Sequence, residues 1–263
     1  MLTISELSAG YGGNTVLRRI SFNLDKGLTV LLGQNGSGKT TLLRAISGSI
    51  RPEAGQITLN DENLLRLSVK QRARRVAQVA GTHQTLAGIT GMDLAEMALH
   101  PAHGLFYRPG KAEREQIIKT AKTMEAETLL PRPLEKMSAG ERQLVELTAA
   151  LCQRTPLLLL DEPTSALDYN RTHDFLTKAK ALAEEKILLA TLHDPGLALC
   201  YADRILLLKD GEIIGDFSPH ETDAWEAETM LRQLYPQIQV IHTAGGLTIL
   251  YPSQNHAPGK ECI

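Results

Sequence analysis

Residues 33–40 read Gly-Gln-Asn-Gly-Ser-Gly-Lys-Thr and fit G-x-x-x-x-G-K-[ST], a pattern whose residue types can hold a phosphate group. Its glycines let backbone N–H groups turn inward without a Cβ clash, and a following helix would add its positive end to this cradle. Lys39 would reach the β- and γ-phosphates of a nucleotide, and Thr40 would ligate Mg²⁺. The predicted nucleotide-binding residues are Gly33, Gln34, Asn35, Gly36, Ser37, Gly38, Lys39, Thr40 and Thr41.

The runs that flank this pattern are those that a phosphate-binding loop needs. Residues 28–32 are apolar and predict a buried strand before the loop, and residues 41–47 predict a helix after it. Further upstream, alternating stretches at 2–7 and 16–24 are separated by glycine-bearing turns, which predicts a small antiparallel sheet. A chance match to the pattern would lack this context, so we interpret the loop as a nucleotide site.

Two acidic residues, Asp161 and Glu162, follow the apolar run at 157–160. A buried parallel strand there would place both acids at its carboxyl end, where open α/β sheets bind their ligands. Asp161 would hold Mg²⁺, directly or through water, and Glu162 would polarise a water for in-line attack on a γ-phosphate. The alternative is two solvated carboxylates at a strand end. We favour the first interpretation because the phosphate loop already implies a metal.

The chain reads as one α/β domain with a helical insertion and a short extension. Strand-like runs at 187–191 and 205–208 alternate with helical runs at 170–184 and 195–201, which predicts a parallel sheet. We predict a domain at residues 1–220, a helical subdomain inserted at about 85–155, in which no strand-like run occurs from about 92, and an extension at 221–263 whose last dozen residues are disordered. Smaller predictions are a helix at 67–75, a strand at 76–80, a loop at 101–110 and a helix at 225–235.

The composition excludes several classes of function. The net charge is −2, so the chain has no basic field for nucleic acid and no polybasic membrane anchor. No apolar run approaches the roughly 18 residues that span a bilayer, and the N-terminus lacks the pattern of a signal peptide. Three cysteines without ligand spacing fit a reduced, cytosolic protein.

Residues 137–143, Met-Ser-Ala-Gly-Glu-Arg-Gln, open a helical run just upstream of the acidic strand. Ser138 and Glu141 form a capping-box pattern, so the plain interpretation is a well-capped helix. The order of the pieces, however, resembles the ATP-binding cassette (ABC) ATPases, in which a signature motif immediately precedes the acidic strand. Residues 163–168 are similar to that family's D-loop, which includes Asp168, and His193 to its switch histidine. Tyr11, in isolation a half-buried loop tyrosine, is similar to its adenine-stacking aromatic.

The resemblance covers about residues 1–216 and implies a P-loop NTPase fold. That fold has a RecA-like parallel sheet core, an N-terminal antiparallel β subdomain and an inserted helical subdomain. The implied activity is ATP hydrolysis with Mg²⁺, with Glu162 and His193 as the catalytic residues. The implied assembly is a head-to-tail dimer, in which the signature residues Ser138, Ala139, Gly140 and Glu141 of one copy complete the ATP site of the other.

Two positions depart from the family pattern. The signature reads Met-Ser-Ala-Gly-Glu in place of Leu-Ser-Gly-Gly-Gln, a mild change that we interpret as compatible with activity. The family also has a glutamine at the end of the strand predicted at 76–80, where the register places Gly81. Gln78 lies within that strand, and Gln84 in the next loop is the candidate to replace the missing metal ligand.

Residues 74–77, 88–90, 93–94 and 193–198 are similar to ATPase subunits of importers for iron–siderophore complexes, haem and cobalamin. The implied partners are integral membrane permease subunits and a periplasmic or lipoprotein substrate-binding protein, with the chain at the cytoplasmic face of the inner membrane. Nucleic acid is not an expected partner. The alternatives are an exporter or non-transport ABC ATPase, and a weakly hydrolysing binding partner, which the missing glutamine motivates.

Overall fold

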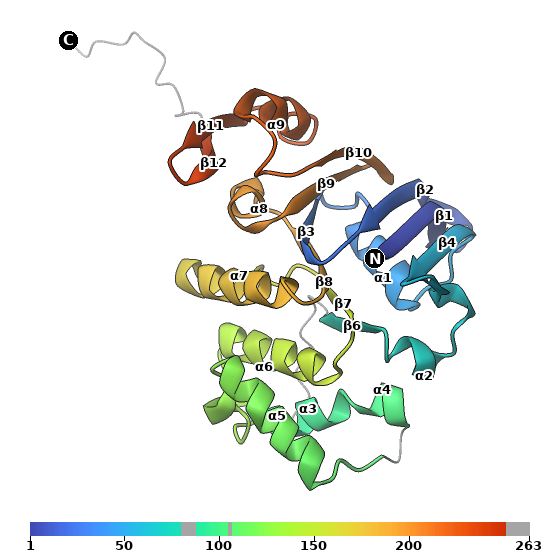
Figure 1. The fold of residues 1–263 in the computed structure, drawn as a ribbon, viewed down its shortest axis with the longest axis vertical. Helices are drawn as coiled ribbons and strands as arrows, with labels where there is room; N and C mark the ends of the chain where they lie inside the picture. Colours follow the sequence, from blue (N-terminus) through green and yellow to red (C-terminus); the bar gives the residue numbers. More distant parts are fainter. Residues whose placement is uncertain (80–87, 105–106, 251–263) are drawn as a thin grey trace, which may run out of the picture.

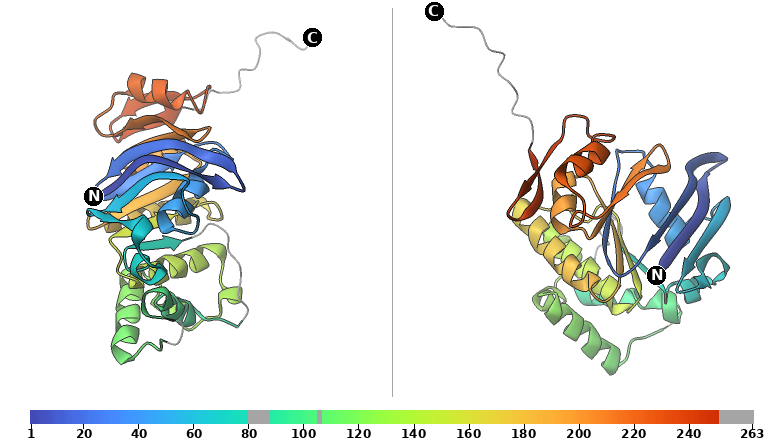
Figure 2. Two further views of the ribbon diagram at one scale, coloured as in Figure 1. Left: turned by 90° about the vertical axis from the view of Figure 1, so that its right-hand side faces the viewer. Right: turned by 45° about the horizontal axis from the view of Figure 1, so that its top comes forward.

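A computed structural model describes residues 1–79, 88–104 and 107–250. The predictions that concern Ala80, Gly81, Gln84 and the disordered tail fall on residues outside these ranges. Within them, three parts follow one another across the molecule (Figure 1): a helical lobe at one end, two sheets in the middle, and a helix with a hairpin at the other end. The same order is visible after a quarter turn (Figure 2).

The central sheet is parallel apart from one edge strand. Its order is β10-β9-β3-β8-β7-β6, and only β10 runs antiparallel to its neighbour. The strands are β3 (Gly27–Leu32), β6 (Val76–Val79), β7 (Leu157–Leu160), β8 (Ile187–Leu192), β9 (Arg204–Lys209) and β10 (Glu212–Phe217). Every residue of β7 and β8 is buried, because both faces of this sheet are covered, and their sequences are therefore continuously apolar rather than alternating.

A second, antiparallel sheet has the order β2-β1-β4-β5. It consists of β1 (Leu2–Tyr11), β2 (Asn14–Leu24), β4 (Ala54–Leu59) and β5 (Glu62–Asn63). The predicted P-loop NTPase fold with an N-terminal antiparallel subdomain is therefore confirmed. The two sheets meet across α1 (Lys39–Ser47), whose apolar side chains belong to the same buried cluster as residues from both sheets.

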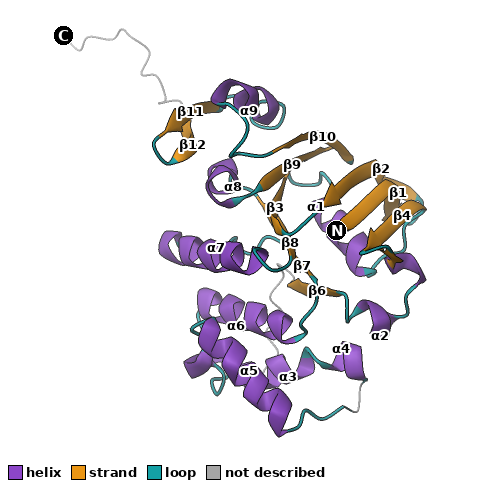
Figure 3. Cartoon of the chain, in the orientation of Figure 1, coloured by secondary structure: helices purple, strands orange, loops and turns teal. Residues whose placement is uncertain are grey.

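The helical lobe contains α3 (Gly91–Met97), α4 (His100–His103), α5 (Lys111–Thr123) and α6 (Ala139–Cys152). No strand is assigned in the described part of residues 92–155, as predicted, and the lobe consists of helices joined by loops in Figure 3. Two local predictions were wrong. The loop predicted at 101–110 contains part of α4, because Pro101 occupies the first turn, where a proline costs no hydrogen bond.

The second error is the helix predicted at 67–75. Only α2 (Val69–Arg72) is helical there, and it follows a separate 3₁₀ turn at Leu64–Arg66. Ser68 is extended and accepts the N–H of Gln71 as the N-cap, so the helix begins only at Val69, and residues 73–75 form turns before β6.

The faces of the central sheet carry different helices. Leu157 and Leu159 point into the buried cluster that contains α1, whereas Leu158 and Leu160 point into the cluster that contains α6 and α7 (Tyr169–Ala183). Because side chains alternate between the two faces of a strand, neighbouring leucines of β7 pack toward α1 on one face and toward α6 on the other. These two helices cover opposite faces of the sheet.

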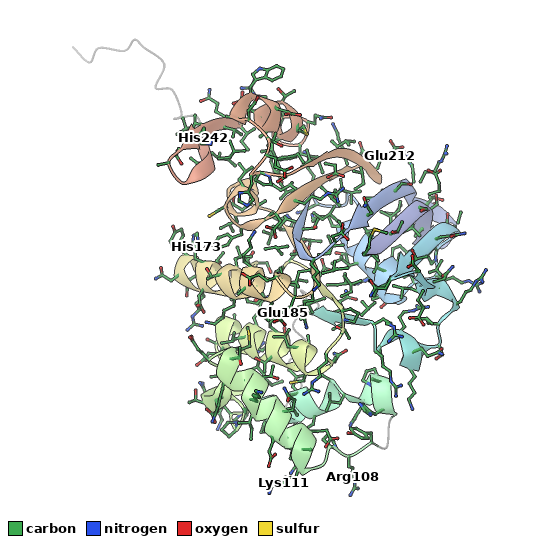
Figure 4. The ribbon with its side chains drawn as sticks, in the orientation of Figure 1. Arg108, Lys111, His173, Glu185, Glu212 and His242 are labelled. Carbon is green, nitrogen blue, oxygen red and sulfur yellow. The ribbon has the colours of Figure 1, made fainter. Side chains whose placement is uncertain are left out.

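The C-terminal extension consists of α9 (Ala224–Leu231) and the hairpin of β11 (Gln239–Thr243) and β12 (Gly246–Leu250). The helix predicted at 225–235 is four residues shorter at its end, and residues 232–238 form turns. The extension packs beside α8 (Pro195–Tyr201), and the labelled His242 marks its hairpin in Figure 4. No described helix is long and apolar enough to cross a membrane.

The turn between β9 and β10 reaches the phosphate loop. Gly211 has φ +82°, its N–H donates to the carbonyl of Ser37 at 3.2 Å, and its carbonyl accepts the N–H of Arg18 at 2.8 Å. A Cβ at Gly211 would lie 1.9 Å from the carbonyl oxygen of Val16. Glycine is therefore required here both by the backbone conformation and by the close approach of β2.

We expect Gly211→Ala to lower the free energy of unfolding by about 2–4 kcal/mol, since left-handed backbone strain adds to the forced shift of β2. Urea unfolding followed by circular dichroism measures this loss. The matched control is Gly246→Ala, at φ +108° with open space around the new methyl group, which should cost about 1–2 kcal/mol. Equal losses in the two variants would contradict the role assigned to the contact with β2.

Candidate nucleotide-binding site

The phosphate-binding loop begins directly after β3 and ends at the start of α1. Lys39 is buried, 5% exposed, and its Nζ donates to the carbonyl oxygens of Gly33 at 2.8 Å and Gln34 at 3.3 Å. Burial lowers the pKa of Lys39, while the carboxylates of Glu162 and Asp161 act in the opposite direction. The ammonium group of Lys39 therefore binds the carbonyl oxygens of the loop and lies near Glu162 and Asp161.

The loop fits an anion by its backbone as well. Gly36 and Gly38 have φ values of +80° and +108°, and Gly38 is the N-cap of α1, so no side chain caps the first N–H groups of that helix. The Oγ of Ser37 is buried without a hydrogen-bond partner among the described residues. A phosphate oxygen supplies the acceptor that these groups lack, so the loop observed here suits the phosphates of a nucleotide.

A network of hydroxyl groups joins the first turn of α1, the residues after β7 and the end of β8. The Oδ1 of Asp161 accepts from the hydroxyls of Thr40 at 3.3 Å and Thr191 at 3.0 Å. The Oγ1 of Thr191 in turn accepts the backbone N–H of Glu162 at 2.7 Å. A threonine hydroxyl and a carboxylate are the hard oxygen donors that Mg²⁺ prefers, so Thr40 and Asp161 fit this ion.

Glu162 and His193 face each other at the open side of this network. The Oε1 of Glu162 lies 2.7 Å from the Nε2 of His193, and both side chains are partly exposed to water. Glu162 has φ +49°, a left-handed conformation that is costly for a residue with a side chain. This turn directs Glu162 away from Asp161, so the two neighbouring acids have different surroundings. Asp161 is buried beside two threonine hydroxyls, whereas Glu162 faces solvent and His193.

Tyr11 ends β1 and is 42% exposed. Its hydroxyl accepts from the Nη1 of Arg44, on α1, at 3.3 Å. The structure thus ties this predicted aromatic residue to the helix that follows the phosphate loop and leaves much of the ring open to solvent.

The signature residues form the N-terminus of α6. The Oγ of Ser138 accepts the N–H of Glu141 at 3.3 Å, and Glu141 accepts the N–H of Ser138 at 2.8 Å, which completes the predicted capping box. Glu141 also pairs with Arg132 at 2.6 Å. The hydrogen bond from Arg132 and, to a smaller extent, the two hydrogen bonds with Ser138 lower the pKa of Glu141 to about 2.

Arg171 links the signature to the predicted D-loop. Its guanidinium donates to the Oγ of Ser138 and lies 3.6 Å from a carboxylate oxygen of Asp168, while Asp168 accepts the N–H of Arg171 as the N-cap of α7. Sequence reasoning missed both Arg171 and Thr191. The i, i+3 spacing of Asp168 and Arg171 was a usable signal, whereas a threonine inside an apolar strand gives none.

The two halves of the predicted site lead into helices on different faces of the central sheet. The phosphate loop leads into α1, and the signature leads into α6, and these helices pack on opposite faces of the central sheet. Gln78 lies within β6 and is half-buried, as predicted. The loop after β6, with Gly81 and Gln84, is outside the described residues.

Comparison with known proteins decides the family. Residues 17–165 match the ABC transporter family. The chain belongs to that family. It is 33% identical to the ferric enterobactin transport ATP-binding protein FepC of Escherichia coli, over 82% of this chain and 81% of FepC. It is 32% identical to the hemin import ATP-binding protein HmuV of Shewanella denitrificans, over 92% and 96% of the two chains.

Solved structures agree on the fold. The ATP-binding cassette MJ1267 in its ADP conformation superposes with a TM-score of 0.80 at 20% identity, covering 90% of this chain and 97% of that one. The dimeric cassette MJ0796 bound to ADP and Pi gives a TM-score of 0.72 at 23% identity, covering 83% and 98%. As a member of this family, the ABC cassette described here is an ATPase that powers transport.

We expect Thr191→Val to lower the free energy of unfolding by about 1–3 kcal/mol, because the N–H of Glu162 loses its acceptor and the buried carboxylate of Asp161 loses a donor. Thr148→Val is the matched control: its side chain is equally buried, but its hydroxyl only donates to a carbonyl one turn back in α6, so we expect a loss below about 1 kcal/mol. Urea unfolding measures both values. A larger loss at Thr148 would refute the importance given to the network.

Glu141→Gln should retain the cap but remove the charge that pairs with Arg132, at a cost of about 0.5 kcal/mol at pH 7. The folded pKa of Glu141 is depressed, so its ionised form stabilises the fold above the ordinary value of 4.5, and this contribution is lost as the pH falls toward about 2. Urea unfolding at pH 7 and pH 3 should therefore show a smaller difference between variant and wild type at pH 3. A difference that grows on acidification would contradict the pairing.

Proposed function

We propose that this chain is the ATP-hydrolysing subunit of an importer for an iron–siderophore, haem or cobalamin-type metal complex. The observation that carries the catalytic part is the convergence of Lys39, Asp161, Glu162 and His193 at one edge of the parallel sheet. The substrate class is supported by the relatives, which include transport proteins for ferric enterobactin and hemin.

Nucleotide binding follows from the loop and its neighbours. The N–H groups of the loop and the ammonium group of Lys39 bind the phosphate oxygens, while the exposed ring of Tyr11 stacks on the adenine. When bound, Mg²⁺ neutralises charge on the phosphates, and Thr40 and Asp161 are the residues that would hold it. Gln84 remains a proposed further ligand.

Hydrolysis uses the pair at the open side of the site. The carboxylate of Glu162 accepts a proton from the attacking water, and its contact with His193 orients it. The imidazole of His193 contacts the γ-phosphate and stabilises charge that develops during transfer. Asp161 remains with its hydroxyl donors and is not available as the base.

The site is completed by a second copy in a head-to-tail dimer. Ser138, Ala139, Gly140 and Glu141 start a capped helix whose N-terminus suits the γ-phosphate of the partner's ATP, and Asp168 lies beside them through Arg171. The placement of α1 and α6 on opposite faces of the sheet supports this, since one copy does not join both halves.

The rest of the assembly follows from the class of transporter. We assign residues 1–220 to the ATPase domain, with the helical insertion at about 85–155 docking on membrane permease subunits and residues 221–263 forming an extension. A substrate-binding protein delivers the metal complex from outside, and the chain works at the cytoplasmic face of the inner membrane.

We expect Glu162→Gln to bind ATP normally and to lower ATP turnover by about 100-fold or more, since a general base contributes that factor or more. With ATP and Mg²⁺ the variant should accumulate as a dimer. Phosphate release and size-exclusion chromatography measure the two effects. The control is Glu185→Gln, an exposed glutamate at the opposite end of β8 from His193, which should behave as wild type.

Turnover that is unchanged in Glu162→Gln would reject the catalytic assignment, and a variant that stays monomeric with ATP would reject the dimer. The substrate class needs a separate test. Co-purification with the permease, followed by ATPase assays with a ferric siderophore, haem or cobalamin, should show stimulation by one of them. Absence of stimulation by all three would refute the substrate class and leave the ATPase assignment intact.

A further inference from the structure

The turn after α9 contacts three loops at the nucleotide-binding edge of the central sheet. The Nε2 of Gln34, in the phosphate loop, donates to the carbonyl of Leu234 at 3.1 Å. The ammonium group of Lys209, at the end of β9, donates to the carbonyl of Gln233 at 3.3 Å. The hydroxyl of Tyr235 donates to the carbonyl of His193 at 3.2 Å. Three consecutive residues of the extension therefore touch the loops that follow β3, β8 and β9.

This turn is itself firmly anchored. Leu234 and Ile238 are 2% and 5% exposed and belong to the main buried cluster. The N–H of Tyr235 donates to Leu231 at 2.9 Å, and the carbonyl of Tyr235 accepts from Ile238 at 3.1 Å. Because the backbone of this turn is anchored, the hydroxyl group of Tyr235 can hold the loop of His193 in place.

His193 lies between this anchor and Glu162. Its imidazole contacts Glu162, its carbonyl accepts from Tyr235, and the next residue, Asp194, caps α8 by accepting from Gly196 at 2.7 Å. The histidine loop and residues 234–238 together line a pocket of about 580 Å³. The hydrogen bond from Tyr235 joins the two segments at the carbonyl of His193.

We propose that Tyr235 is a positioning residue for ATP hydrolysis: its hydroxyl holds the backbone of His193 so that the imidazole reaches Glu162 and the γ-phosphate together. This inference rests on the catalytic role proposed for His193. Loss of the hydroxyl leaves a partly solvated carbonyl that water can satisfy, so stability changes little. The geometry of the histidine loosens, and this affects the chemical step rather than nucleotide binding.

Tyr235→Phe removes only the hydroxyl group. We expect kcat for ATP hydrolysis to fall about three- to tenfold, the factor that one ordinary hydrogen bond contributes, while the KM for ATP and the melting temperature stay close to wild type. The matched control is Tyr107→Phe, which loses a hydroxyl that donates to Glu113 at 3.0 Å in the helical lobe, and it should leave kcat unchanged.

The same substitution in a His193→Ala background tests whether Tyr235 acts through His193. Single-turnover assays with labelled ATP should show that adding Tyr235→Phe changes the residual rate by less than about twofold. Such non-additive effects are expected when one residue acts through the other. A full additional loss in this background, or a kcat for Tyr235→Phe equal to wild type while His193→Ala is impaired, would overturn the inference alone. Wild-type turnover of His193→Ala would overturn both this inference and the role proposed for His193.

Discussion

The geometry of the site depends on one buried hydroxyl group. Thr191 donates to the carboxylate of Asp161 and accepts the N–H of Glu162, so it links the end of β8 to the first two residues after β7. This link supports the left-handed turn at Glu162, a conformation that is adopted only when its surroundings impose it. The separation of the two acids into a buried residue and a solvent-facing residue therefore begins at a side chain with no role in the chemistry.

A second constraint is the alternation of side chains along β7. Odd-numbered leucines pack toward α1 and even-numbered leucines toward α6, so the phosphate loop and the signature helix start from opposite faces of one sheet. In the head-to-tail dimer proposed above, each copy would complete the site of the other, and the bound nucleotide would contribute to the interface between them.

Much of this could be predicted from the sequence, because the decisive signals are local. The glycines around Lys39 and the acids after residues 157–160 have fixed spacing and chemistry, and fully buried strands are readable as continuous apolar runs. Long-range pairs were not predictable. Thr191 reads only as a strand-forming residue, and Tyr235 reads as the end of a helix, because their partners lie 29 and 42 residues away along the chain. Short elements such as α2 were also not predicted, since the helix begins only after its N-cap Ser68 and ends in turns after Arg72, within a run of favourable composition.

The place of β3 in the sheet has a consequence for how the protein is made. The strand that carries the phosphate loop is flanked by β8 and β9, which come from the last third of the sequence. During synthesis, β3 therefore leaves the ribosome before either neighbour, and both neighbours are available only after Lys209 has emerged. Pairing at such sequence distance is slow to form, so the nucleotide site is among the last parts of the molecule to be assembled. Nucleotide binding therefore reports that β8 and β9 have joined the sheet, and a chain that ends before them lacks the strands that flank the phosphate loop.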